Sequence, residues 1–487
     1  MPIKKKINVL FASAEAEPFV KIGGLGDVAG TLPIAIQLLS KSDTNIVIDI
    51  RLVIPYHAII RTKNFSIHHL GKFTVKATSK TFTCDVHYTD ETGIPVYLLD
   101  GDLIDNKSPV YHADPIKDGE KYVFFSICCL ELAKYLNWKV DILHCNDWHT
   151  SPAIQALHTR YKTDPLFINT KSILSLHNMP YMGWGAQKAL TEFGLPASRS
   201  KILPDWAKHT PLPLGILYAD EVIAVSPTYA KEILTPEFSC TLDSFLMNRS
   251  KHIIGILNGI DSSIWDPSSD PDLISTYDFT TLEKKTDNKI SLNKKFNLDI
   301  DPSIPLLTII SRMDEQKGID IGLKGLLACI EEKWQAIILG TGNKDIEKMA
   351  MDLSLKYPHK IKTITQFDAH LAHQLYAGAD IFLMPSRYEP CGISQMIAMN
   401  YGTIPVARAT GGLKDTIIQY KHNKIDGTGF LFKKAFPSAL AYALRKALKV
   451  YNEKSTWRIL QENGMKKDFS WNKSAMEYVK VYQSLIK

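Results

Sequence analysis

One carboxylate and two cations lie on two loops in the second half of the chain, where they could stabilise developing charge. Glu389 follows the apolar run 381–384 and precedes a segment with helical spacing. Unpaired amides at a helix start favour anions, so this loop could hold a charged leaving group beside an acid. Arg312 and Lys317 follow another apolar run, and two fixed cations can neutralise a diphosphate. An ordinary solvated loop explains the two cations nearly as well.

A glycine loop near the N-terminus is the first candidate of the other half. KIGGLGDVAG places Lys21, Gly23, Gly24 and Asp27 ahead of an amphipathic helix. Backbone amides beside a lysine suit a phosphate or a sugar hydroxyl. The spacing matches neither the dinucleotide fingerprint nor the phosphate-binding P-loop. A tight turn that needs glycines for its shape is an equally good interpretation.

Polar residues at the ends of further apolar runs are the next candidates. HCNDWHTS carries Asp147 and SLHNMPY carries His177, and such positions commonly bind ligand hydroxyls. A helix-capping acid and a satisfied core histidine are the ordinary alternatives for these two. Ser151 followed by Pro152 predicts a helix cap with proline in the first turn. Phe367 ends a run and is either a nucleobase platform or a core side chain.

Strands must alternate with helices to position these loops. Apolar runs from INVLFASAE onward are separated by segments with helical patterning, which predicts an α/β fold with doubly wound, mainly parallel sheets. The polar, aperiodic stretch from Asn258 marks a boundary between domains 1–260 and 261–469. An amphipathic helix is expected over 470–487. Because ligands bind outside the carboxyl ends of such strands, both sets of loops are expected to face one inter-domain site.

Composition excludes several classes of protein. The 487 residues exceed one ordinary core, and the net charge of +6 is small and scattered, which argues against nucleic-acid binding. Seven cysteines without a CxxC pair indicate reduced thiols in a cytosol. The short apolar run after Lys4–Lys6 is followed by Glu15 and Glu17, so it predicts a buried strand rather than a signal peptide. No run is long enough to span a membrane. SSDPD is interpreted as turn chemistry, and we expect no metal and no cofactor.

A series of motifs follows in one order along almost the whole chain. They are KIGGLGDVAG, HCNDWHTSPA, SPTYA, NGID, SRMDEQKGID, PSRYEPCGISQMIAMNYGTIPV, ATGGLKDT and a closing SW. In this order they closely resemble the bacterial glycogen synthases and plant starch synthases, which are glycosyltransferases of GT-B architecture with two Rossmann-like domains. The resemblance implies a bacterial, cytoplasmic hexosyltransferase that needs no metal. It would transfer glucose from ADP-glucose to the nonreducing end of an α-1,4-glucan such as glycogen, with retention of configuration.

The resemblance also implies roles for single residues. Arg312 and Lys317 would bind the diphosphate, and Glu389 would contact the glucosyl ring and steady its positive charge. His177 would complete the catalytic set by holding the sugar near its 6-hydroxyl with Asn178. The remaining substrate-binding residues would be Lys21, Gly23, Gly24, Asp27, Asp147, Asn258, Phe367 near the adenine, Cys391, Gly392 and Ile393. In the family the final helix returns to the first domain.

One motif departs from the family pattern, and two other functions remain open. The family commonly continues its His-Asn motif with Tyr-Gln-Gly, whereas this chain has Tyr181-Met182-Gly183 followed by WGAQ. The departure concerns a local sugar or acceptor contact and leaves the catalytic set intact. The alternatives are a GT-B enzyme that uses UDP-glucose or a small acceptor, and a silent glucan-binding scaffold. The oligomeric state is not predicted.

Overall fold

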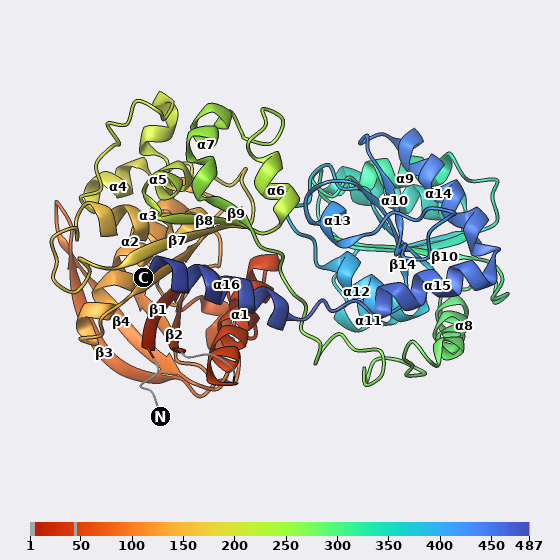
Figure 1. Cartoon of the computed structure of the whole chain (residues 1–487), viewed down its shortest axis with the longest axis horizontal. Coiled ribbons are helices and arrows are strands. Elements are labelled where there is room, and N and C mark those ends of the chain that lie inside the picture. The colour runs from red at the N-terminus through yellow and green to blue at the C-terminus, as the bar shows by residue number, and fades with distance from the viewer. Residues whose placement is uncertain (1–4, 43–45, 487) are drawn as a thin grey trace. The chain divides into compact units, whose positions relative to one another are not determined.

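The computed structural model describes residues 5–42 and 46–486, and Figure 1 labels its elements. The chain forms two compact units, one of Met1–Gly259 with Trp471–Lys487 and one of Ile260–Ser470. Each unit has a mainly parallel sheet with helices around it. The predicted fold class, α/β with doubly wound sheets, is therefore confirmed.

The first unit is built on a nine-stranded sheet with the order β3-β4-β5-β2-β1-β6-β7-β8-β9. Its strands are β1 (Lys5–Ala12), β2 (Ile46–Pro55), β3 (His68–Lys76), β4 (Thr81–Thr89), β5 (Val96–Gly101), β6 (Ile142–Asn146), β7 (Lys171–Leu176), β8 (Glu221–Ala224) and β9 (Ile253–Gly255). β3, β4 and β5 pair antiparallel, and the other neighbours pair parallel. The central β1 is buried among β-branched side chains, as expected for a parallel strand covered on both faces. The N-terminal apolar run is thus a buried strand, as predicted.

Helices of the first unit flank this sheet. They are α1 (Gly24–Ser42), α2 (Pro115–Tyr135), α3 (Asp147–His158), α4 (Gln187–Glu192), α5 (Pro211–Tyr218), α6 (Pro227–Glu232), α7 (Asp243–Arg249) and α16 (Trp471–Leu485), with 3-10 turns η1 (Ala58–Thr62), η2 (Asp205–His209) and η3 (Ser250–His252). α16 packs against α1, and its Tyr482 hydroxyl lies 2.7 Å from His144 Nδ1 on β6. The first unit is therefore completed by a helix that lies far from the rest of it in the chain.

The predicted cap at Ser151 is wrong. α3 begins at Asp147, so Ser151 and Pro152 lie inside the helix. The Ser151 hydroxyl donates to the carbonyl of Asp147 at 2.9 Å, which is a helix-interior bond rather than a cap. The strand β6 ends at Asn146 without an intervening loop, and this direct junction is what the sequence pattern does not reveal.

The second unit has a six-stranded, fully parallel sheet with the order β12-β11-β10-β13-β14-β15. Its strands are β10 (Leu306–Ile310), β11 (Gln335–Leu339), β12 (Ile361–Ile364), β13 (Ile381–Met384), β14 (Ile404–Arg408) and β15 (Phe430–Phe432). Its helices are α8 (Lys285–Lys295), α9 (Ile319–Leu327), α10 (Lys344–Lys356), α11 (Ala369–Gly378), α12 (Ser394–Asn400), α13 (Gly411–Thr416), α14 (Pro437–Tyr451) and α15 (Lys454–Met465), with the 3-10 turn η4 (Leu282–Lys284). β10 and β13 are neighbours, so the loops that follow them leave the same edge of the sheet.

A buried ion pair secures the opposite end of β13. Lys289 Nζ on α8 lies 2.6 Å from the carboxylate of Asp380, and both side chains are nearly inaccessible. Asp380 also accepts the amide of Leu306 at 2.8 Å, so it joins the starts of β10 and β13. Breaking such a pair by removing one partner commonly destabilises a protein by about 3–5 kcal/mol.

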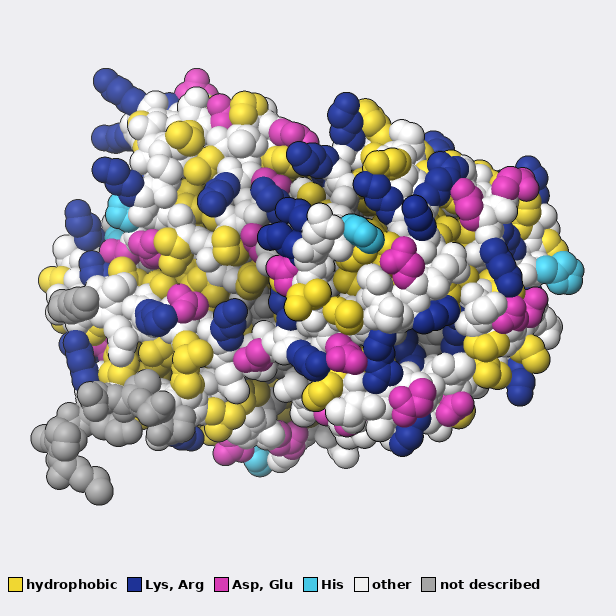
Figure 2. All heavy atoms as spheres, turned by 45° about the vertical axis from the view of Figure 1, so that its right-hand side comes forward, with side chains coloured by type: hydrophobic (Ala, Val, Ile, Leu, Met, Phe, Trp, Pro, Cys, Tyr) yellow, Lys and Arg dark blue, Asp and Glu magenta, His cyan; other side chains and the backbone are white. Residues whose placement is uncertain are grey.

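Charges of both signs are mixed over the visible surface. Figure 2 shows Lys and Arg side chains among Asp, Glu and hydrophobic ones on the face drawn. Within the residues that the structure describes, no helix is both long and apolar enough to cross a membrane. All seven cysteines are free thiols, and six of them are buried.

Candidate functional site

Glu389 lies in the loop between β13 and α12 and is nearly inaccessible, with 4% of its surface exposed. Lys317 Nζ is 2.8 Å from one of its carboxylate oxygens and 2.7 Å from the other. The Ser386 hydroxyl donates to the second oxygen at 2.9 Å. The carboxylate is therefore fixed in position by one cation and one hydroxyl, a geometry that sequence spacing did not reveal.

The loops that carry Lys317 and Glu389 are held to each other. The backbone amide of Arg387 donates to the carbonyl of Gln316 at 2.8 Å. The guanidinium of Arg387 donates to both carboxylate oxygens of Asp320 on α9, at 2.8 and 2.9 Å. This bidentate pair lowers the pKa of Asp320. These contacts connect the two loops, so they keep the relative positions of Lys317 and Glu389 fixed.

Gly411 and Gly412 at the start of α13 pack closely against the backbone of the Glu389 loop. A Cβ on Gly411 would come 1.9 Å from the carbonyl oxygen of Glu389, and one on Gly412 would come 2.0 Å from that of Cys391. The Gly412 amide donates to the Glu389 carbonyl at 3.1 Å. No side chain fits at these two positions, so the glycines allow close packing of the two loops.

The other predicted residues of the second unit lie on the same sheet edge or near it. Arg312 follows β10, and its guanidinium lies 3.3 Å from Asp314 with about half of the side chain exposed. Phe367 lies between β12 and α11 and is 87% exposed, so its alternative role in the core is wrong. Cys391 is buried, and Gly392 (φ 70°) and Ile393 lead directly into α12.

The glycine loop of the first unit holds a carboxylate of the chain itself. Glu15, between β1 and α1, is buried and accepts the amides of Ile22 and Gly23, the latter at 3.1 Å. Burial raises the pKa of Glu15 despite these hydrogen bonds. The predicted amide at Gly23 is thus already engaged within the protein, whereas Gly24 begins α1.

Lys21 is paired with two acids, one in the same loop and one in the first turn of α1. Its ammonium lies 2.6 Å from Asp27 and 3.1 Å from Glu17, and about 39% of the side chain is exposed. Burial raises the pKa of Asp27 to about 6, although Lys21 opposes the shift. Lys21 and Asp27, both predicted as substrate-binding, therefore form an ion pair at the start of α1.

Asp147 organises the other predicted residues of the first unit. It begins α3 with the left-handed φ of 54°, and its carboxylate accepts the amides of His177 and Asn178 at 2.7 and 3.3 Å. A non-glycine residue in this conformation is strained, which is common at functional sites. The junctions after β6 and β7 are thereby joined, and the helix-capping alternative for Asp147 is wrong, because the N-cap of α3 is Asn146.

His177 is neutral and its tautomer is defined. Its Nε2 faces Asn146 Oδ1 at 2.9 Å, while the amide nitrogen of Asn146 donates to Ala12, so the proton lies on Nε2. Burial lowers the pKa of His177 to about 3. Its Nδ1 is then an acceptor, which suits a ligand hydroxyl better than an anion. Asn258, the remaining predicted residue, is buried at the end of this unit, and its side-chain oxygen has no hydrogen-bond partner among the described residues.

Replacing Asp147 by asparagine is expected to change how stability depends on pH. Burial raises the pKa of Asp147 to about 7, against about 3.9 unfolded. Between these values the folded state holds the extra proton, so this residue makes the wild type less stable as pH rises from 4 to 7. Three pKa units correspond to at most about 4 kcal/mol. An asparagine side chain does not titrate. The melting temperature of Asp147→Asn minus that of the wild type should therefore increase as pH rises from 4 to 7.

The measurement is a thermal melt of both proteins at intervals from pH 4.5 to 8. Asp352→Asn on the exposed face of α10 is the matched control for the loss of an aspartate from the surface. A constant difference for Asp147→Asn would show that Asp147 is ionised throughout.

Sequence reasoning missed a group of buried polar residues behind Glu15. The Tyr111 hydroxyl donates to Glu15 at 3.0 Å, and Lys121 Nζ donates to the carbonyl of Val110 at 2.8 Å. Lys121 also lies 3.1 Å from His57 Nδ1, and burial lowers the pKa of Lys121 to about 7. The signal for this group in the sequence is Glu15, an acid between an apolar run and a glycine loop.

A second group that sequence spacing missed lies in the second unit. Asp270 and Asp272 of SSDPD come together with His373 of α11, about a hundred residues later, at distances that suit a metal. Asp270 is, however, engaged by His373 Nδ1 at 2.7 Å and by the Tyr401 hydroxyl at 2.5 Å. The amide of Asp272 donates to Asp270 at 2.9 Å, so the turn interpretation of SSDPD is correct.

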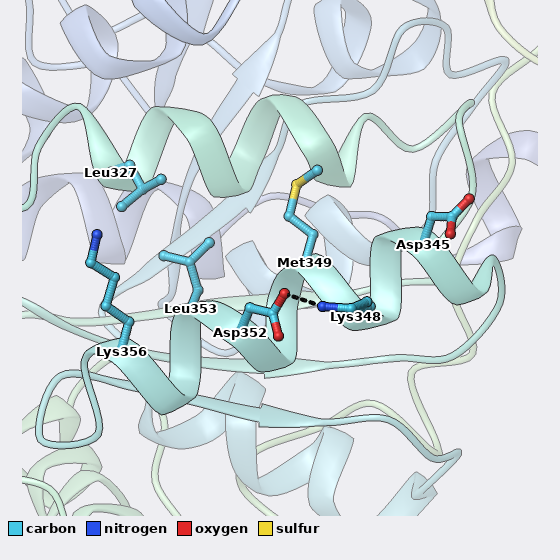
Figure 3. A pocket seen from close by; sticks show the side chains of 7 residues that line it. All are labelled: Leu327, Asp345, Lys348, Met349, Asp352, Leu353 and Lys356. Carbon is cyan, nitrogen blue, oxygen red and sulfur yellow. Dashed lines mark hydrogen bonds and ion pairs between the residues drawn. The ribbon is translucent and has the colours of Figure 1, made fainter.

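A hollow of about 460 Å³ lies away from all of these residues. Figure 3 shows it between α9 and α10, lined by Leu327, Asp345, Lys348, Met349, Asp352, Leu353 and Lys356. Its charged groups are long surface side chains, and Lys348 is paired with Asp352 at 2.7 Å. It contains none of the candidate residues and is a surface depression between helices.

Comparisons with known proteins agree with this arrangement. The family model of the starch synthase catalytic domain matches residues 8–248, and that of the group 1 glycosyl transferases matches residues 291–465. A glycogen synthase of Clostridium perfringens (strain 13 / Type A) is 39% identical over 488 residues, and one of Clostridium novyi (strain NT) is 36% identical over 485 residues. Both alignments cover 99% of each chain.

A solved structure extends the likeness to the fold. The catalytic domain of starch synthase IV from Arabidopsis thaliana, bound to ADP and acarbose, superimposes with a TM-score of 0.88 at 29% identity. The superposition covers 99% of both chains. The chain belongs to the family of bacterial glycogen synthases and plant starch synthases, and it has their GT-B fold.

Proposed function

We propose that the protein elongates an α-1,4-glucan by transferring glucose from ADP-glucose to its nonreducing end, with retention of configuration. The carrying observation is the buried Lys317–Glu389 pair at the carboxyl edge of a parallel sheet, in a chain of this family. A sugar that leaves a diphosphate develops positive charge, and the diphosphate develops negative charge. A fixed carboxylate can stabilise the positive charge on the sugar, and a fixed cation beside it can stabilise the negative charge on the diphosphate.

In this proposal the second unit binds the donor. Lys317 and Arg312 receive the diphosphate, Glu389 faces the glucosyl ring, and the exposed ring of Phe367 stacks on the adenine. Cys391, Gly392 and Ile393 line the sugar from the start of α12. The exposure of Arg312 and Phe367 supports these roles, because both can reach a ligand without unpacking the unit.

The first unit binds the sugar and the acceptor in this proposal. Neutral His177 accepts a hydroxyl at Nδ1, and Asn178 lies beside it at the end of β7. Asp147 and Asn258 complete the sugar side, and Lys21 with Gly23, Gly24 and Asp27 forms the glycine-loop side. The shared hydrogen bonds of Asp147 support this assignment, because they place two of these residues in one rigid junction.

The direct test incubates the pure protein with ADP-glucose and glycogen. ADP should be released and the outer chains should lengthen, both equally well with and without a metal chelator. UDP-glucose in competition separates the leading proposal from a UDP-glucose enzyme, and glucose or maltose as acceptor tests the small-acceptor alternative. Absence of ADP release under all conditions, together with tight glycogen binding, would identify a silent scaffold instead.

We further propose a cytoplasmic site of action. The seven free thiols support it, because unpaired cysteines are typical of a reducing compartment.

A further inference from the structure

We propose that Trp184 and Trp206 form a second carbohydrate-binding platform on the first unit, where the glucose rings of the acceptor chain stack away from the reacting end. The inference rests on the proposed function, because it takes the acceptor to be an α-glucan. The two tryptophan rings lie 5.1 Å apart between centroids, at 36° to each other. No role in the first unit's core accounts for Trp184, since 54% of its surface is exposed.

The backbone presents Trp184 rigidly. It lies between Gly183 and Gly185, whose φ angles of 84° and 90° are left-handed. A Cβ on Gly183 would come 2.6 Å from the Trp148 ring, and one on Gly185 would come 2.5 Å from the carbonyl oxygen of Pro115. Both glycines are therefore pressed onto the body of the unit, and the residue between them is held outward.

The chemistry of the platform suits a sugar. Aromatic faces bind the apolar C–H faces of glucose rings, and two tilted rings can hold consecutive units of a curved chain. Asp205 and Lys208 of η2 flank Trp206 and pair at 2.7 Å, with the Asp205 side chain almost fully exposed. A carboxylate and an ammonium at the rim can exchange hydrogen bonds with sugar hydroxyls.

Trp184 is close in sequence to His177 and Asn178, which are proposed to bind the sugar. Asn178 precedes Trp184 by six residues, so their Cα atoms are at most about 21 Å apart. In between, Met182 is buried with 2% exposed. Position 182 therefore offers no polar contact to an acceptor, whereas the rings of Tyr181 and Trp184 reach the surface with 53% and 54% exposed.

The experiment compares Trp184→Ala, Trp206→Ala, Trp184→Phe and Trp184→Leu with the wild type. Binding of glycogen and maltoheptaose is measured by affinity electrophoresis and fluorescence titration without donor, and steady-state kinetics are measured with ADP-glucose. Each alanine change should weaken glucan binding about three- to tenfold and raise the KM for glycogen similarly. The kcat and the KM for ADP-glucose should not change. Trp184→Phe should retain most of the binding, whereas Trp184→Leu should bind as weakly as alanine.

Tyr442→Ala, which removes an aromatic ring 63% exposed on α14, is the matched control and should bind glucan normally. Wild-type protein that releases ADP, with Trp184 variants that bind glycogen as it does, would overturn the platform and leave the proposed function intact. Wild-type protein that neither releases ADP nor binds glycogen would refute the proposed function itself. Normal glucan binding by Trp184→Leu would also overturn the platform, because it would show that no aromatic face is needed. Altered sedimentation of the alanine variants would instead identify an interface with protein.

Discussion

Glu389→Gln is expected to lower the turnover of ADP-glucose with glycogen by roughly a hundredfold or more, the usual effect of removing one electrostatic partner of a transition state. Glutamine keeps the shape of the side chain, and its one oxygen can still accept from both Ser386 and Lys317, which lie 2.9 and 2.7 Å from the same carboxylate oxygen. The negative charge is lost, and the oxygen that accepts only from Lys317 becomes an NH2 donor. The loss should therefore appear in kcat, measured by ADP release, and the protein should remain folded.

Asp380→Asn is the matched control, because it removes a buried, lysine-paired carboxylate from the other end of β13. Both substitutions remove the partner of a lysine and should lower the melting temperature, but Asp380→Asn should leave kcat within about twofold, whereas Glu389→Gln should lower it. Glu389→Asp keeps the charge but withdraws it by one methylene, so it should fall between wild type and glutamine. A loss of under about threefold for Glu389→Gln would remove Glu389 from the reaction.

Lys317→Ala is expected to lower kcat/KM for ADP-glucose by about a hundredfold or more. Lys317 Nζ contacts both carboxylate oxygens of Glu389, and about a fifth of its side chain is exposed. The variant would lose a cation for the diphosphate and would leave a buried carboxylate without its ion pair. Lys317→Arg keeps the charge and should recover part of the activity, although a guanidinium does not reproduce the geometry of an ammonium.

A double variant separates the two tasks of Lys317. If it neutralises the diphosphate, Lys317→Ala combined with Glu389→Gln should be slower than either single variant. If it only holds Glu389 in place, the double variant should be no slower than Glu389→Gln alone. The second outcome would assign diphosphate binding to Arg312, whose own replacement by alanine would then carry the larger effect on donor KM.

The alternation of strands and helices was predictable because buried parallel strands leave long apolar runs. β13, its polar loop and α12 were all visible in this way, and so was the amphipathic helix α16. The hairpin β3–β4 was not, because its residues alternate between exposed and buried and include many charged and polar side chains. A strand open to solvent on one face leaves a weaker pattern than one covered on both.

The candidate residues were predictable as positions but not as pairs. Lys317 and Glu389 are 72 residues apart, and only the adjacency of β10 and β13 brings them into contact. Glu15 is a similar case, because its carboxylate occupies amides that the glycine pattern offered to a ligand. The start of α3 at Asp147 was missed because its left-handed backbone lets a strand turn into a helix without the usual loop residues.

The return of α16 to the first unit sets an order on folding during synthesis. Tyr478 and Tyr482 of this helix are fully buried in the core around β1 and α1, and Tyr482 reaches His144 on β6. A ribosome has made all of the second unit, Ile260–Ser470, before these tyrosines exist. The part of the chain made first is thus completed last. Until then the apolar surface of α1 that α16 will cover is exposed, and chaperones and proteases can reach the nascent chain there.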